Sequence, residues 1–348
     1  METVKKVYRQ NKLIVISAVM LVLCSEILCT ILKRNSEGVS FIDIAVRLIC
    51  LAVSTVAAYR FGGTSGGRNL PVLCAALALI TVWTAYSGLI TIFGVSIYLF
   101  PVCAFICVCF LSEYYVKYCT NSLLHSLIYI ALGVLMFYNA SGDAEAYFIT
   151  VLQIALFIRF YNRITDKRLK IINIIYTVIS AVINSILIVS GIYNYINYRY
   201  EEGQNAGLIE NVIKTLRPFG KSEGFEDIAD LSRTYNLIRI SGYFGYVVGI
   251  MVFVLLTVFV LSVFFKVLKR KGSIIPVIFA AVSTLGVNYV AGIFVNSGIV
   301  LGNLNVDIPV LSGSKYGYII VGILLGMIFA LDSGSSTEKN RAQVKEER

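Results

Sequence analysis

The chain has 348 residues, of which 57% are hydrophobic and only 14% are charged, and its formal net charge at pH 7 is +10. A soluble domain has roughly 25% charged residues, so this composition excludes an ordinary soluble enzyme. The basic residues are scattered over several short loops and form no groove interleaved with aromatic residues, so nucleic acid is not an expected partner.

Apolar segments follow one another along the chain, and most are long enough to cross roughly 30 Å of hydrocarbon as a helix. The alternating pattern of a membrane barrel is missing, so helices must satisfy the backbone in the bilayer. The sequence predicts an all-α, polytopic integral membrane bundle that forms a single membrane domain over residues 1–348. About ten spans are expected, near residues 12–32, 40–59, 70–91, 95–115, 121–138, 145–161, 170–193, 236–266, 274–299 and 315–331.

Lysine and arginine residues collect in every second loop, most densely in residues 5–12, 159–170 and 266–271. Positively charged loops stay on the cytoplasmic side of a membrane. The pattern therefore predicts a multi-pass protein with both its N-terminus and its C-terminus in the cytoplasm. The polar tail, residues 332–348, is expected to be cytoplasmic and disordered.

Most of the eight cysteines lie inside the predicted spans, where a free cysteine behaves as a small hydrophobic residue. The only histidine, His125, lies in a different span from Cys103 and Cys107, so no closed set of metal ligands forms. Neither a metal site nor a cofactor is expected.

A long extracytoplasmic loop, residues 194–235, separates the seventh and eighth spans. Apolar residues recur at helical spacing over 208–216 and again over 225–231, which predicts short amphipathic helices on the outer membrane surface. Two interpretations of this loop stay open. It is either a solvated cap over the bundle or a substrate-facing loop that supplies a carboxylate as general base.

Charged side chains inside a bilayer need partners. Glu26 in the first span and Arg47 in the second are expected at similar depth, so they can form a structural ion pair, and Asp43 lies one turn from Arg47. A polar cavity that opens outward would require the same residues. Arg239, close to the outer start of the eighth span, either reaches the interface or lines a cleft.

Three short motifs occur in a fixed order near the end of the chain. Residues 308–312 read IPVLS, Gly326 follows in the last span, and Asn296, Gly298 and Gly302 precede them. With ten spans and one long outer loop, this arrangement resembles the SEDS family of shape, elongation, division and sporulation proteins (FtsW, RodA, SpoVE). A loop that folds back to line an outward cavity would suit such turn-rich residues.

The sequence departs from the family pattern at three positions. FPVC, residues 100–103, replaces the polar residues of the Gln-Pro-Ser-Glu motif that opens span four. RTYNLIR, residues 233–239, contains no acid where the family has its catalytic aspartate. The SYGGSS run is reduced to SGSKYG, residues 312–317. The chain is therefore a divergent relative at most, and these departures put catalysis in doubt.

The resemblance implies a protein of the bacterial cytoplasmic membrane that handles undecaprenyl-linked peptidoglycan precursor (lipid II), with a class B penicillin-binding protein as partner. The family joins lipid-linked disaccharides, which needs a carboxylate base and cations for the departing pyrophosphate. The nearest acid to the family position is Asp230, and Asp227 or Glu226 are the substitutes.

The same resemblance assigns substrate contacts to Arg239 and Lys315 as phosphate ligands, and to Ser312 and Asn296 as motif residues. Three alternatives remain. One is a non-catalytic relative that acts as a scaffold, and another is a transporter with Glu26, Arg47 and Arg239 along its path. The third is another lipid-linked glycan polymerase of the O-antigen ligase class, for which the outer loop offers the arginines Arg199, Arg217 and Arg233.

Overall fold

The computed structural model describes most of the chain, including nearly all of the predicted spans. The described residues are 2–33, 41–61, 69–87, 89–92, 95–139, 144–197, 204–225, 235–268, 275–297, 308, 310–311 and 314–346. The helices are α1 (Glu2–Lys33), α2 (Phe41–Phe61), α3 (Leu70–Ser87), α4 (Phe100–Tyr114), α5 (Leu123–Asn139), α6 (Ala144–Phe160), α7 (Lys167–Asn197), α8 (Gln204–Lys214), α10 (Asn236–Phe244), α11 (Tyr246–Leu268), α12 (Ile275–Asn296) and α13 (Lys315–Glu346).

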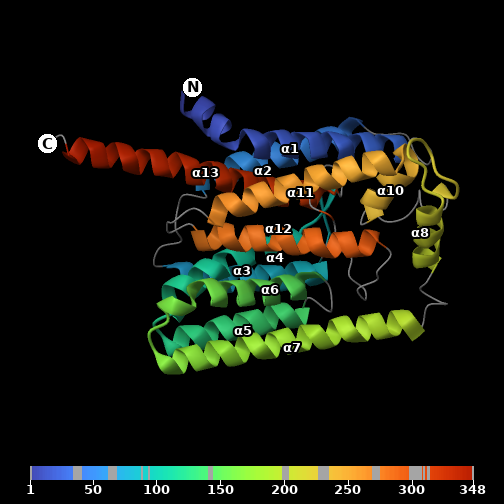
Figure 1. Ribbon diagram of the computed structural model, residues 1–348. Helices are drawn as coiled ribbons and strands as arrows, with labels where there is room; N and C mark the ends of the chain where they lie inside the picture. Colours follow the sequence, from blue (N-terminus) through green and yellow to red (C-terminus); the bar gives the residue numbers. More distant parts are fainter. Residues whose placement is uncertain are drawn as a thin grey trace.

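The long helices lie side by side along one common direction, and α8 stands across one end of them (Figure 1). Both chain termini and the connection between α6 and α7 lie at the opposite end. We call these the α8 end and the termini end. The α6–α7 connection, which is predicted to be cytoplasmic, therefore shares an end with both termini, and the described part of the outer loop lies at the other end.

Four described helical stretches are long and apolar enough to cross a membrane, namely 42–60, 100–119, 246–268 and 275–296. Three shorter apolar stretches lie at 70–84, 123–136 and 315–331. Many large apolar side chains on the bundle surface are exposed, among them Val72 at 72% and Met251 at 65%. Outward-facing apolar side chains of this kind are what a lipid environment favours, because lipid tails are as apolar as the side chains.

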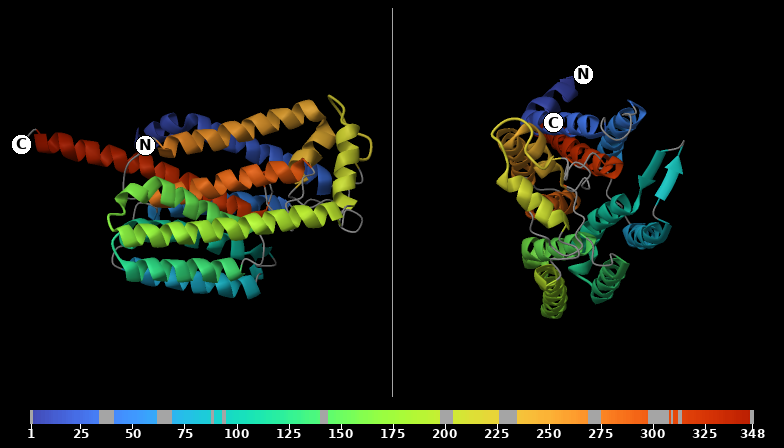
Figure 2. Two further views of the ribbon diagram at one scale, coloured as in Figure 1. Left: turned by 60° about the horizontal axis from the view of Figure 1, so that its bottom comes forward. Right: turned by 90° about the vertical axis from the view of Figure 1, so that its right-hand side faces the viewer.

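The start of the fourth predicted span was wrong, because residues 95–98 form a strand and not a helix. Strands β1 (Leu89–Ile92) and β2 (Val95–Tyr98) pair antiparallel, with Leu89 opposite Tyr98. Alternating isoleucine, threonine and valine residues favour a strand here. Helix α4 begins only at Phe100, where Pro101 occupies one of the first helical positions that tolerate proline. The hairpin projects from the side of the bundle (Figure 2).

The eighth predicted span is divided into α10 and α11 at Gly245. Its φ angle is +99°, a conformation that favours glycine, and a Cβ added there would lie 2.4 Å from the carbonyl oxygen of Pro218. The outer loop fits into this break. The N–H groups of Tyr246 and Val247 donate to the carbonyls of Arg217 (2.9 Å) and Pro218 (3.3 Å) at the start of α11. Loop carbonyls thereby pair with N–H groups that a helix end otherwise leaves unsatisfied.

Helices α2 and α13 pack against each other along much of their length, although they are far apart in the sequence. Two glycines on α13 permit the close approach. A Cβ on Gly322 would lie 2.6 Å from the carbonyl oxygen of Leu51, and one on Gly326 would lie 2.4 Å from that of Thr55. Small residues four apart are the usual contact of closely packed membrane helices.

The last helix differs from the disordered tail predicted for residues 332–348. Helix α13 continues from the apolar segment to Glu346 and extends beyond the neighbouring helices at the termini end (Figure 1). From residue 338 on, the tail consists mostly of glutamate, lysine, arginine and other residues with good helix propensity, and it follows a formed helix that removes the need for nucleation.

Candidate functional site

The segment before α13 is held by hydrogen bonds from two other helices at the α8 end. Leu311 is fully buried, and its carbonyl accepts from Ser25 Oγ on α1 (3.2 Å) and from Asn236 Nδ2 on α10. The neighbouring Val310 has φ +69°, a strained conformation for a β-branched residue. Such strain persists only where the surroundings impose it, and it often marks a functional segment.

A buried ion pair lies next to this anchor. Arg47 Nε donates to Glu26 Oε1 at 2.9 Å and Arg47 Nη2 to Glu26 Oε2 at 2.6 Å, a bidentate arrangement. Tyr318 on α13 donates its hydroxyl to Glu26 Oε1 at 2.7 Å. The pair predicted from sequence is therefore present, and it joins α1, α2 and α13 in one hydrogen-bonded group.

Asp43 has a partner that the sequence did not predict. Its carboxylate lies 3.4 Å from Lys315 Nζ at the start of α13. Asp43 and Lys315 are both partly exposed, so this contact lies nearer to solvent than the Glu26–Arg47 pair. Lys315, predicted as a phosphate contact, is thus drawn to the first turn of α2.

Arg239 of α10 and Asn296 at the end of α12 lie in the same region. Arg239 is buried and its Nη1 donates to Asn236 Oδ1 at 3.0 Å. The N–H of Ile238 donates to Asn296 Oδ1 at 3.1 Å, and Asn296 Nδ2 donates to the carbonyl of Gly292 at 2.8 Å. Asn296 therefore satisfies a helix-start N–H of α10, which gives it a positioning part in the fold. Its predicted contact with substrate stays a prediction.

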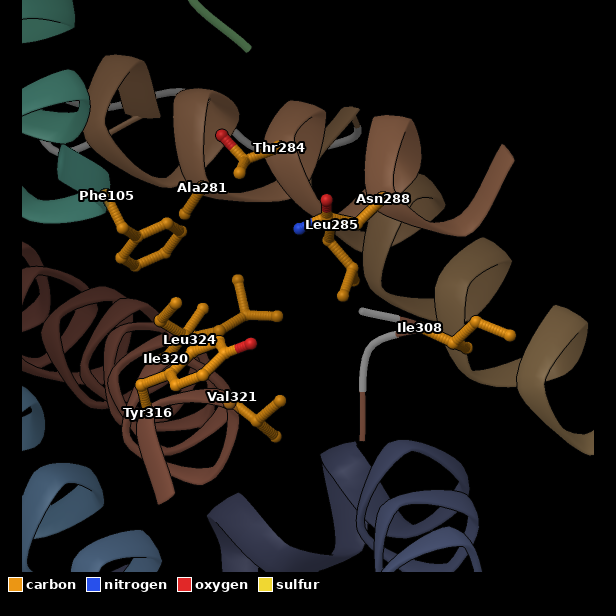
Figure 3. A pocket seen from close by; sticks show the side chains of 11 residues that line it. Phe105, Ala281, Thr284, Leu285, Asn288, Ile308, Tyr316, Ile320, Val321 and Leu324 are labelled. Atoms are coloured by element: carbon orange, nitrogen blue, oxygen red, sulfur yellow. The ribbon is translucent and has the colours of Figure 1, made fainter. Parts of the chain in front are cut away.

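A small cavity of about 50 Å³ lies between α4, α12 and α13, beside this network. In Figure 3 the α12 side chains Thr284 and Asn288 lie on one side of it and Tyr316 of α13 on the other. Its described lining includes no carboxylate. A water needs roughly 10–15 Å³ of such volume, so the cavity can hold a few waters but no sugar ring.

The predicted base lies outside the described residues, as do parts of the predicted substrate site. These residues are Glu226, Asp227, Asp230, Ser312, Pro309, Gly313, Gly298 and Gly302. Their assignments stay predictions. The outer-loop arginines Arg199 and Arg233 also lie outside, while the described Arg217 forms an exposed ion pair with Glu223 at 2.6 Å.

The described part of the outer loop is packed onto the bundle. Ile209 and Val212 of α8 are buried against Phe225 of the outer loop and Ile238 of α10. These four residues form a small apolar cluster at the α8 end. Tyr235 precedes α10, and burial raises the pKa of its phenol. A phenol that is harder to ionise is a poor general base at neutral pH.

Three members of the network were missed from the sequence, namely Ser25, Asn236 and Tyr318. Their only sequence signal is a polar group within an apolar segment, and many such groups simply bond their own helix, as Thr81 does with the carbonyl of Leu77. Within the described part of the chain, no group of three His, Cys, Asp or Glu side chains could hold a metal ion.

The anchor of Leu311 predicts a non-additive loss of stability. Substituting Ser25→Ala leaves the buried carbonyl with one donor and is expected to cost about 1 kcal/mol. Asn236→Ala also removes the acceptor of Arg239 Nη1, so it is expected to cost about 2–3 kcal/mol. The double substitution leaves the carbonyl without a donor from these two helices, and its cost is expected to exceed the sum by about 1 kcal/mol. Thermal unfolding of the four proteins in detergent measures this coupling, and additive losses would contradict the shared anchor.

No family model and no curated protein sequence matches the chain. Solved structures do match. One is a chain from a study of how a peptidoglycan synthase complex coordinates polymerization and crosslinking, with TM-score 0.59 and 12% identity, covering 91% of this chain and 96% of that one. Another is an aspartate-to-alanine variant of the Thermus thermophilus rod shape determining protein RodA, with TM-score 0.52 and 12% identity, covering 90% and 96%.

The apolar helices and their exposed apolar surface define a multi-pass membrane protein. More particularly, the chain has a SEDS-like fold over about nine-tenths of its length, so the resemblance stated from its motifs is confirmed as a divergent one. An identity of 12% shows the fold and not the activity.

Proposed function

We propose that the chain is a SEDS-like protein of a bacterial cytoplasmic membrane that binds a lipid-linked peptidoglycan precursor at its α8 end. The observation that supports this most is the placement of Arg239 and Lys315. Arg239 bonds Asn236, which in turn bonds the Leu311 carbonyl, and Lys315 lies four residues further along the chain. Two cations near one strained segment suit the pyrophosphate of an undecaprenyl-linked disaccharide.

Glycosyl transfer in this proposal needs a base, and the described lining of the cavity contains no carboxylate. We assign that part to the outer loop, with Asp230 first and Asp227 or Glu226 as substitutes. The base would deprotonate the attacking sugar hydroxyl, and the two cations would stabilise charge on the departing pyrophosphate. A crosslinking enzyme such as a class B penicillin-binding protein would be the partner, in line with the complex that contains one structural neighbour.

The test uses the purified full-length protein and lipid II. Asp230→Ala, Asp227→Ala and Glu226→Ala are made singly, and loss of the true base is expected to lower the polymerisation rate about 10²- to 10⁴-fold. Asp166→Ala, at an exposed position of the termini end, serves as the control and should leave the rate unchanged. Full activity in all three variants would remove the loop carboxylates as candidates.

A second outcome separates binding from catalysis. If the parent protein makes no polymer but binds lipid II, and Lys315→Gln weakens that binding, the chain is a non-catalytic relative that holds the precursor for another enzyme. The apolar residues at 100–103, where the family has polar ones, and the absence of an acid from the described part of the cavity lining favour this second candidate. Binding that is unaffected by Lys315→Gln would contradict the proposed phosphate contact in either case.

A further inference from the structure

A second charged region lies at the termini end, between α6 and α7, and neither the predicted site nor the fold comparison assigns it a function. Five cations occur there within a short stretch of chain, and the single acid among them is Asp166. They are Arg159, Arg163, Lys167, Arg168 and Lys170. We call these five residues the α6–α7 basic patch.

Within the described residues, none of the five cations forms an ion pair with a carboxylate. Elsewhere the described cations commonly do, as in Lys117 with Glu113 and Lys214 with Glu210. Asp166 Oδ1 instead accepts from the backbone N–H of Arg168 at 2.8 Å, where it satisfies a donor at the start of α7. The patch therefore keeps most of its positive charge available for an external anion.

Three of the cations are seated on aromatic rings. Arg159 lies 5.3 Å from the ring centre of Phe279, Arg163 lies 5.1 Å from that of Phe160, and Lys170 lies 4.6 Å from that of Tyr161. These contacts attract a cation without neutralising it, and they restrict long side chains that would otherwise move freely. An incoming anion thus meets charges that are already partly ordered.

The patch borders apolar surface that faces outward. Ile158, next to Arg159, is 72% exposed, and Ile171 and Ile175 on the first turns of α7 are 48% and 52% exposed. Further exposed isoleucine and valine residues continue along α7. A phospholipid whose phosphate binds these cations would therefore have its acyl chains against an apolar helix face. A free phosphate would make no contact with that face.

We infer that the α6–α7 basic patch binds the head group of an anionic phospholipid, with the acyl chains lying along α7. A lipid with two phosphates suits five clustered cations best, because each basic residue near a membrane surface contributes about 1 kcal/mol toward anionic lipid. The occupied site would tie α6 to α7 at the membrane surface. This inference does not depend on the proposed function at the α8 end.

The test measures lipid binding by the full-length protein in neutral detergent, with diphosphatidylglycerol as the probe and phosphatidylcholine as the zwitterionic comparison. The double variant Arg163→Gln/Lys167→Gln is expected to bind diphosphatidylglycerol on the order of 30-fold more weakly, about fivefold for each cation removed. The matched control Lys12→Gln/Arg60→Gln removes one lysine and one arginine, both exposed and outside the patch. It should bind like the parent.

Two further measurements keep the inference open to contradiction. Arg163→Lys retains the charge and should keep most of the affinity, whereas a loss as large as that of the double variant would contradict binding through the positive charge. Equal weakening by the patch variant and the control would show attraction by total charge alone. Full competition by inorganic phosphate at matched phosphate concentration would show an anion site without a lipid component, and either result would overturn the proposal.

Discussion

Replacing Arg47 with leucine is expected to destabilise the protein by about 3–5 kcal/mol, because it leaves the Glu26 carboxylate buried without its bidentate partner. Glu26 is only 8% exposed, and Arg47 supplies two of the hydrogen bonds that its oxygens accept. Tyr318 remains as a donor, but a neutral hydroxyl does not replace the positive charge. The loss of folded protein is measured by circular dichroism during thermal unfolding in detergent.

The control removes both charges together. Glu26→Leu/Arg47→Leu is expected to recover most of the stability, since a buried ion pair often contributes little over apolar residues of similar size. Tyr318→Phe should cost about 1.5–3 kcal/mol, as it removes one donor to a charged acceptor. If the double variant is as unstable as Arg47→Leu alone, the pair has a role beyond mutual neutralisation.

The ion pair also shows what sequence can predict about a membrane site. Position along a span gives depth, so Glu26 and Arg47 could be placed at the same level before their contact was seen. Depth does not say which way a side chain faces around its helix axis, and it does not say which third helix packs against the pair. Tyr318 and the Leu311 carbonyl were therefore missed, and so was the contact of Asp43 with Lys315.

Hydropathy located the helices better than it located their ends. The apolar run that spans Val95 and Phe100 is equally compatible with strand and helix, because both bury apolar residues. Strand pairing with residues 89–92 and Pro101 decide between them. The break at Gly245 is set by contacts with Pro218 and Phe219, far away in the sequence, so no local pattern marks it. The carboxylates at 226–230 stay predictions because they lie outside the described residues.

Substituting Gly326→Ala on α13 is expected to cost about 2–3 kcal/mol, the upper range for an overpacked interior site. The added Cβ would lie 2.4 Å from the carbonyl oxygen of Thr55, 2.7 Å from the Cβ of Ala58 and 2.8 Å from the backbone nitrogen of Tyr59. Two of these three atoms are backbone, so no rotamer change can relieve the contact. Helices α2 and α13 would have to separate.

The double variant Gly322→Ala/Gly326→Ala should cost about 4–6 kcal/mol, because both contacts of the pair are lost. Ser54→Ala is expected to restore part of the Gly322→Ala loss, since Ser54 Oγ is the closest atom there, but the carbonyl of Leu51 still lies at 2.6 Å. It should restore none of the Gly326→Ala loss, because Ser54 is not among the nearest atoms to that Cβ.

Gly286→Ala on α12 is the matched control, because a Cβ there meets nothing within 4 Å. It is expected to leave stability unchanged or to raise it by about 0.4–1 kcal/mol, because alanine lowers the conformational entropy of the unfolded chain. Cysteine crosslinking between α2 and α13 distinguishes helix separation from general unfolding: Gly326→Ala should lower the yield while α3 and α4 stay packed. An unchanged yield together with lost stability would contradict the proposed contact, since close approach of these two helices is what places Lys315 of α13 beside Asp43 of α2.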